Sequence, residues 1–80
     1  MIKFYGAFWC SDCQRAKFIL DHNKIEYEYI NIDEDEEASE YVKKVNNGNR
    51  SIPTLIFEDE SILVEPTTEE LIKKLGIEAG

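Results

Sequence analysis

The chain has 80 residues, which is enough for one small hydrophobic core, and its formal net charge is -8 at pH 7. This acidic balance disfavours nucleic acid and anionic membranes as partners, whereas basic or neutral proteins fit it better. No apolar run approaches the roughly 18 residues of a membrane-spanning helix, and the first residues lack the pattern of a signal peptide. We therefore expect a single domain over residues 1–80 that is a monomer in the cytoplasm.

The first half of the chain predicts a strand, a helix, a second strand and a second helix. Both strand segments are rich in aromatic and β-branched residues with a period of two, and both helix segments place apolar residues at helical spacing. Acidic residues occupy the first turn of each helix, as the helix dipole favours. Cys10 directly precedes the first helix. These four elements span residues 2–7, 11–22, 25–32 and 33–46.

The second half predicts a hairpin followed by a helix. Two short apolar segments, residues 54–57 and 61–64, are separated by a three-residue acidic turn. Thr67 and Glu70 then have the spacing of a capping box, and Gly76 is typical of a helix end. The last helix therefore begins just after Thr67.

The order βαβαββα restricts the possible architecture. A strand, helix and strand in sequence form a parallel pair with a right-handed crossover, and the last two strands form an antiparallel hairpin. The sequence therefore predicts an α/β fold with a mixed four-stranded sheet and helices on both of its faces.

Cys10 and Cys13 are the two cysteines of the chain, and a structural disulfide, a metal half-site or a redox pair are the alternatives. A disulfide across so small a loop constrains the unfolded chain little. A tetrahedral metal site needs two further ligands, and the single histidine, His22, lies about three turns along the same predicted helix. A thiol at a helix N-terminus with a second thiol one turn away meets the requirements of thiol–disulfide exchange, so redox chemistry is favoured and no metal is expected.

Several motifs together resemble the glutaredoxin-like redoxins of the thioredoxin fold, and the resemblance covers essentially the whole chain. Residues 9–13 (WCSDC) follow the first strand, and residues 52–54 (IPT) precede the third. Residues 48–54 (GNRSIPT) and 65–67 (EPT) look most like mycoredoxins and related thioredoxin-like glutaredoxins, with NrdH-type redoxins further away.

The resemblance implies a thiol–disulfide oxidoreductase in which Cys10 is the nucleophile and Cys13 the resolving thiol. It also implies that Pro53 is cis and lies against the cysteines, which leaves the backbone of Ile52 free to pair with an extended substrate segment. Trp9 belongs either to the substrate-facing rim beside Cys10 or to the core, and the sequence leaves both possibilities open.

Two departures from the classical glutaredoxins concern the binding of glutathione. Ala7 stands where they carry a lysine, and residues 64–67 (VEPT) replace their Gly-Gly and acidic sequence. Arg50 and the backbone amides near Thr67 remain as candidates for binding an anion. We therefore expect a general protein-disulfide reductase, or an enzyme that uses another low-molecular-weight thiol, rather than a glutathione-specific enzyme.

Ser11 and Asp12 occupy the positions between the cysteines and are candidates for tuning the thiolate. The negative charge of Asp12 opposes a thiolate at Cys10, while the helix N-terminus favours one by a similar amount. We expect the Cys10 thiolate to be only modestly favoured and the dithiol to be a reductant.

The leading hypothesis is a dithiol electron donor that needs no bound cofactor and cycles through a Cys10–Cys13 disulfide. A flavoprotein reductase or a small thiol would regenerate the dithiol, and disulfide-bearing proteins would be the substrates. A close rival uses Cys10 alone to remove a small thiol from protein mixed disulfides. A third hypothesis, from another class, is a redox-inert module that binds a partner or carries a metal or cluster.

Overall fold

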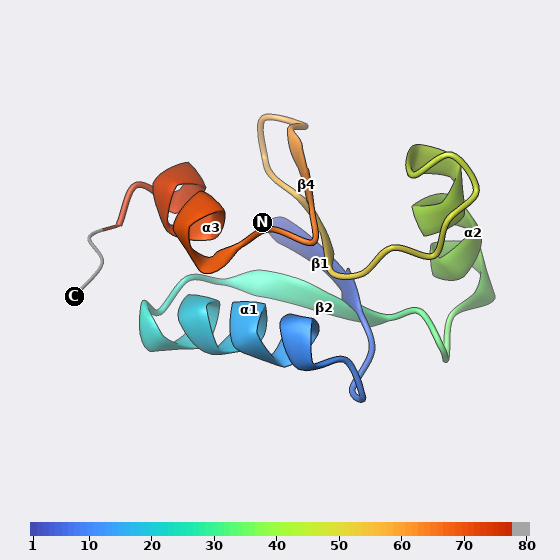
Figure 1. The fold of residues 1–80 in the computed structure, drawn as a ribbon, viewed down its shortest axis with the longest axis horizontal. Helices are drawn as coiled ribbons and strands as arrows, with labels where there is room; N and C mark the ends of the chain where they lie inside the picture. The colour runs from blue at the N-terminus through green and yellow to red at the C-terminus, as the bar shows by residue number, and fades with distance from the viewer. Residues whose placement is uncertain (78–80) are drawn as a thin grey trace.

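The order of elements in the computed structural model, which describes residues 1–77, is the predicted βαβαββα. Figure 1 shows the elements along the chain. Their bounds are β1 Ile2–Gly6, α1 Ser11–His22, β2 Tyr27–Asn31, α2 Glu36–Val45, β3 Thr54–Ile56, β4 Ile62–Val64 and α3 Thr68–Leu75.

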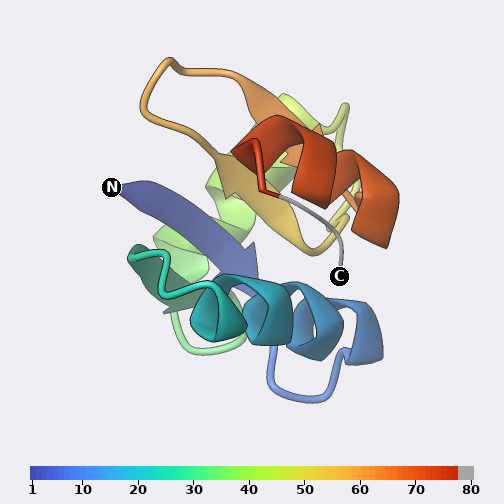
Figure 2. The ribbon, with the colours of Figure 1, turned by 90° about the vertical axis from the view of Figure 1, so that its left-hand side faces the viewer.

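The four strands form one mixed sheet in the order β2-β1-β3-β4. β1 runs parallel to β2 and antiparallel to β3, and β3 and β4 form an antiparallel hairpin. Helices α1 and α3 cover one face of the sheet and contact each other, while α2 covers the other face (Figures 1 and 2). The predicted mixed sheet with helices on both faces is confirmed.

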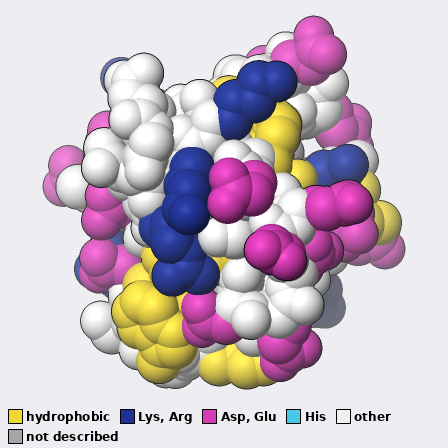
Figure 3. Space-filling model, turned by 90° about the vertical axis from the view of Figure 1, so that its right-hand side faces the viewer, with side chains coloured by type: hydrophobic (Ala, Val, Ile, Leu, Met, Phe, Trp, Pro, Cys, Tyr) yellow, Lys and Arg dark blue, Asp and Glu magenta, His cyan; other side chains and the backbone are white. Residues whose placement is uncertain are grey.

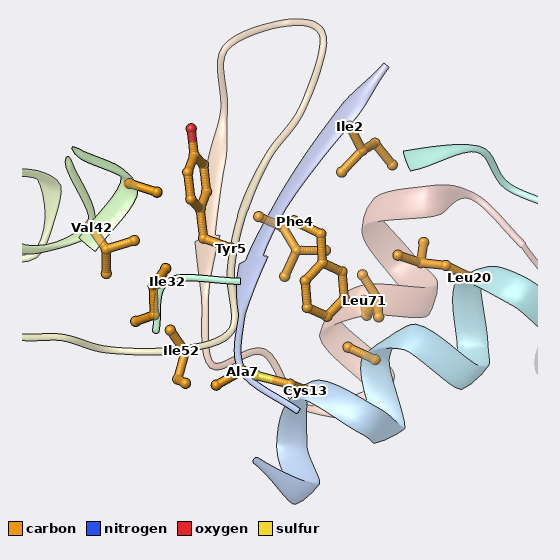
Figure 4. Packing of buried hydrophobic residues seen from close by; sticks show 13 residues of the cluster. Ile2, Phe4, Tyr5, Ala7, Cys13, Leu20, Ile32, Val42, Ile52 and Leu71 are labelled. Carbon is orange, nitrogen blue, oxygen red and sulfur yellow. The ribbon is translucent and has the colours of Figure 1, made fainter. Parts of the chain in front are cut away.

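The hydrophobic core has two halves because successive side chains of the central strand β1 point to opposite faces. Phe4 packs toward Leu20 of α1 and Leu71 of α3, and Tyr5 points toward Val42 of α2 (Figure 4). Cys13 lies in the half of the core between the sheet and helices α1 and α3. The packing of α1 against the sheet therefore fixes the position of Cys13.

The predicted ends of several elements were wrong by one to three residues. Residues 33–35 lie outside α2, because the Asp35 side chain accepts a hydrogen bond from the Ala38 N–H (3.0 Å) and so begins the helix at Glu36. β1 ends at Gly6 rather than at Ala7, and β2, β3 and β4 are each shorter than predicted. The predicted bounds of α1, residues 11–22, are confirmed.

Candidate active site

Cys10 is the N-cap residue of α1, with φ of -84° and ψ of 114°. Its Sγ accepts a hydrogen bond from the Cys13 N–H (3.3 Å), and its carbonyl oxygen accepts the first helical bond from the Gln14 N–H (3.0 Å). The side chain is half-buried, so an incoming group can approach the sulfur from one side. A helix N-terminus with a donated N–H is a favourable place for negative charge on sulfur.

Cys13 lies one turn further along α1 and is fully buried, with an exposed fraction of 0%. Burial raises the pKa of its thiol to about 12, and the hydrogen bond to Cys10 and the nearby charges of Cys10 and Asp12 act in the same direction. A hydrogen bond from the Ala7 backbone opposes this rise. Both cysteines are free thiols, and the buried one holds its proton at neutral pH.

Asp12 forms an ion pair with Arg15 one turn along α1 (3.4 Å), which the sequence did not predict. The guanidinium of Arg15 also donates a hydrogen bond to the Pro66 carbonyl oxygen (3.4 Å). Its positive charge therefore offsets part of the negative charge that Asp12 places near Cys10. Because this pair is about half exposed, water screens it strongly. The tuning roles of Asp12 and Ser11 stay predictions.

Trp9 lies in the exposed rim beside Cys10 rather than in the core, with 68% of its surface exposed. Its Nε1–H donates a hydrogen bond to Asp33 Oδ2 (2.6 Å), and Arg50 Nη2 donates to Asp33 Oδ1 (2.9 Å). Arg50 Nε also donates to Ser39 Oγ (3.0 Å). The Asp33 carboxylate thus links Trp9, in the loop before α1, to Arg50, in the loop before β3. It holds the indole ring of Trp9 at the protein surface.

Asp33 is the functional candidate that sequence reasoning missed. It appears in the sequence as one acid in a run of acids, and its position two residues after the end of β2 is the one signal that sets it apart. The hydrogen bonds from Arg50 and then from Trp9 lower the pKa of its carboxyl group.

The Ile52–Pro53 peptide bond is cis, as the family resemblance implied. Ile52 and Pro53 are buried and directly precede β3, the antiparallel neighbour of β1. Figure 4 places Ile52, Ala7 and Cys13 at the same end of the sheet. The substrate-pairing role of this segment stays a prediction.

Two backbone amides at the N-terminus of α3 are bonded to side chains of the same helix terminus. The predicted capping box is confirmed: the Glu70 N–H donates to Thr67 Oγ1 (3.1 Å), and the Thr67 N–H donates to Glu70 Oε1 (2.8 Å). Of the predicted anion-binding groups, Arg50 and the Thr67 amide each bind a carboxylate of this chain. An external anion would have to displace these carboxylates to reach either group.

Within residues 1–77, no three side chains of the metal-ligating types gather at one place. His22 lies at the far end of α1, where its ring stacks on Phe18 at 5.6 Å. In the same part of the chain, no helix combines the length and the apolar character needed to cross a membrane.

The fold and the paired cysteines define a thiol–disulfide oxidoreductase of the thioredoxin fold, and the comparisons with known proteins identify its family. The family model described as Glutaredoxin matches residues 2–62, which include both cysteines and the cis proline. The chain therefore belongs to the glutaredoxin family, whose members need no bound cofactor because their cysteines carry the electrons.

Individual relatives agree with this assignment. The chain is 39% identical over 79 residues to a protein of Mycobacterium tuberculosis named "Putative glutaredoxin", covering 99% of this chain and 94% of that protein. It is 39% identical over 74 residues to mycoredoxin 1 of Corynebacterium glutamicum, covering 92% and 91%. The crystal structure of a glutaredoxin from Archaeoglobus fulgidus superimposes with a TM-score of 0.74 at 26% identity, covering 92% and 84%.

Proposed function

We propose that the chain reduces protein disulfides by a dithiol cycle in which Cys10 is the nucleophile and Cys13 the resolving thiol. The Cys10 thiolate attacks one sulfur of a substrate disulfide, and the other sulfur leaves with the electron pair and takes up a proton. Cys13 then attacks Cys10 Sγ, which forms the Cys10–Cys13 disulfide and releases the second substrate thiol. The observation that carries this proposal is the half-exposed N-cap sulfur of Cys10, bonded to the N–H of the buried Cys13.

The surface around Cys10 suits a protein segment that is neutral or basic. Phe8 and Trp9, which directly precede Cys10 in the chain, are 62% and 68% exposed and form an aromatic rim beside it. In Figure 3 the face around α2 carries acidic side chains on both sides of a band of Lys and Arg, and the net charge of the chain is -8. An apolar rim on a protein of net negative charge favours peptides with aromatic or basic residues next to their cystine.

The proposed substrate is therefore a protein disulfide rather than glutathione. Glutathione carries two carboxylates, and the groups that would bind them here, Arg50 and the Thr67 amide, already bind Asp33 and Glu70. The proposed docking segment is the backbone at Ile52, in the extended stretch before β3. A flavoprotein reductase or a small thiol in the cytoplasm is the proposed source of electrons.

Turnover of two substrates by three proteins tests the cycle. The substrates are insulin and a protein carrying a glutathione mixed disulfide, and the proteins are the wild type, Cys13→Ser and Cys10→Ser. We expect only the wild type to reduce insulin, and we expect Cys13→Ser to accumulate a mixed disulfide with an insulin chain that is visible by mass spectrometry. Full turnover of the glutathionylated protein by Cys13→Ser, together with no insulin reduction by the wild type, would instead establish the monothiol cycle.

A further inference from the structure

The resolving step poses an electrostatic problem, because the thiol that must ionise is buried. The pKa of Cys13 is raised to about 12, mainly by burial. Cys10 and Asp12 lie close enough in the first turn of α1 to oppose a negative charge on Cys13 still further. The Ala7 backbone supplies one hydrogen bond that lowers the pKa of Cys13, and a second donor at the sulfur would make its thiolate more accessible.

Gly6, at the end of β1, marks where such a donor lies. A Cβ atom at Gly6 would lie 2.9 Å from Phe4 Cε1, 3.0 Å from Cys13 Sγ and 3.1 Å from the hydroxyl oxygen of Tyr29. The Cys13 sulfur and the Tyr29 hydroxyl therefore lie beside the same small space at Gly6. A larger residue at this position would crowd Phe4, the sulfur and the hydroxyl.

The ring of Tyr29 is held in place by aromatic neighbours. It stacks on Phe4 with centroids 5.0 Å apart and on Phe8 at 5.7 Å with an interplanar angle of 11°. Within residues 1–77 the Tyr29 hydroxyl makes no hydrogen bond to another protein group, whereas the hydroxyl of Tyr27 on the same strand donates to Asp21 Oδ1 (2.7 Å). The Tyr29 hydroxyl is therefore free to donate to a sulfur.

The protonation state of Tyr29 suits a donor. Burial raises the pKa of its phenol to about 12, and a negative charge on Cys13 or Cys10 acts in the same direction when either thiol is ionised. The hydroxyl consequently keeps its proton at neutral pH. Cys10 and Asp12 disfavour a thiolate at Cys13, whereas a protonated hydroxyl beside the sulfur is a hydrogen-bond donor that favours one.

We propose that the Tyr29 hydroxyl donates a hydrogen bond to the Cys13 sulfur as its thiolate forms and thereby accelerates the resolving step. This inference rests on the proposed dithiol cycle. In the mixed disulfide, the Cys13 thiol gives up its proton and its thiolate attacks Cys10 Sγ. The bond from Cys10 to the substrate sulfur breaks, and the leaving thiolate takes up one proton, which balances the one lost. Tyr29 keeps its own proton throughout.

A chromophoric disulfide separates the two steps in one experiment. An equimolar amount of 5,5′-dithiobis(2-nitrobenzoate) releases one thionitrobenzoate when Cys10 attacks and a second when Cys13 resolves the mixed disulfide, and stopped-flow absorbance resolves the two phases. For Tyr29→Phe, which removes only the hydroxyl, we expect an unchanged first phase and a second phase slowed about tenfold, as for loss of a hydrogen bond to a charged group. In the wild type and in Tyr29→Phe, the logarithm of the second-phase rate should rise with pH, and the two curves should be parallel.

Tyr27→Phe is the matched control, because it removes a hydroxyl from the same strand and the same face but not from the neighbourhood of Cys13. Its second phase should equal that of the wild type. The inference is overturned if Tyr29→Phe leaves the second phase unchanged between pH 6 and 8, and also if it slows both phases equally, which would indicate a general disturbance of the site. Thermal unfolding of Tyr29→Phe shows whether the fold persists.

Failure of the underlying dithiol cycle gives a different result. If the wild type releases one thionitrobenzoate for each chain and matches Cys13→Ser, then Cys13 does not resolve the mixed disulfide, and both the cycle and the role of Tyr29 are rejected. Two equivalents from the wild type and one from Cys13→Ser confirm the cycle, and the effect of Tyr29→Phe on the second phase then decides the inference by itself.

Discussion

The N-cap residues of α1 and α3 both have an extended backbone, but the two helix termini have different consequences. In α1 the cap atom is the sulfur of Cys10, which accepts the Cys13 N–H. In α3 the cap is Thr67, and Glu70 returns a hydrogen bond to the Thr67 N–H, so the end is closed by this chain's own groups. At α1 the N-cap side chain is itself reactive and half-exposed, so the helix dipole and the free backbone N–H groups can stabilise a thiolate. At α3 the capping box uses backbone N–H groups in hydrogen bonds that stabilise the helix.

Cys10→Ser should produce the largest effect and should separate chemistry from capping at the α1 terminus. Serine is a good N-cap but a poor nucleophile at neutral pH. We expect the fast reaction with the chromophoric disulfide to fall by at least about 10³-fold. The free energy of unfolding, measured with urea, should change by less than about 0.5 kcal/mol. A large loss of stability would mean that the Cys10 side chain is mainly structural.

Thr67→Ala should show the opposite pattern at the α3 terminus. Loss of the cap costs about 1 kcal/mol, which lowers the melting temperature of a domain of this size by about 4–8 °C. The rate of the Cys10 reaction should stay at its wild-type value, because the Thr67 hydroxyl accepts its hydrogen bond from the Glu70 N–H of the same helix. If the Cys10 reaction slowed along with the melting temperature, the two termini would be coupled and the contrast between them would fail.

Asp33→Asn tests the aromatic rim beside Cys10, and the rate of insulin reduction should change by a few-fold. The variant weakens the hydrogen bonds that hold Trp9, so insulin reduction should fall about threefold while the reaction with the small chromophoric disulfide remains unchanged. Equal slowing with both substrates would show that Asp33 acts on the sulfur chemistry and not on the rim.

The same network gives a pH-dependent signal. Because the pKa of Asp33 is lowered in the folded protein, its bonds to Arg50 and Trp9 persist below the ordinary range of an aspartate and are lost as pH falls through the lowered value. Trp9 is the single tryptophan, so its fluorescence should change in that acidic range and not at neutral pH. In Asp33→Asn this transition should be absent, and its persistence there would assign the change to another group.

Glu70→Gln should have the smallest effect and should sharpen the description of the α3 terminus. Glutamine still accepts a hydrogen bond from the Thr67 N–H, and only the favourable charge near the helix N-terminus is lost. We expect the melting temperature to fall by about 1–2 °C. A loss as large as that of Thr67→Ala would show that charge, and not the reciprocal hydrogen bonds, closes this end of the helix.

The sequence predicted the two helix termini because their signals are local. The CxxC pair, followed by apolar residues one and two turns further along, predicts α1. The Thr67–Glu70 spacing predicts the start of α3. The predicted start of α2 was wrong because three acids, residues 33–35, precede it, and Asp33 and Asp35 both have the chemistry of an N-cap. Only the fold assigns Asp35 to the cap and Asp33 to Trp9 and Arg50.

Contacts between distant segments could not be predicted in this way. The period of two places Tyr27 and Tyr29 on one face of β2, but it does not show that one hydroxyl reaches Asp21 and the other lies beside the same small space at Gly6 as a buried sulfur. Asp12 and Arg15 have the i, i+3 spacing at which side chains on a helix can pair. The expectation for the Cys10 thiolate considered the negative charge of Asp12 without this partner. The cis state of Pro53 came from the family resemblance and not from the residues themselves.

The rates at which iodoacetamide modifies the two cysteines measure the difference between them most directly. Brief alkylation of the reduced protein at pH 7, followed by peptide mass spectrometry, gives a separate rate for each thiol. Because Cys10 is half-exposed at the start of α1 and Cys13 is buried with its pKa raised to about 12, Cys10 should react at least about 100-fold faster. Equal rates, or faster modification of Cys13, would contradict the assignment of Cys10 as the attacking sulfur.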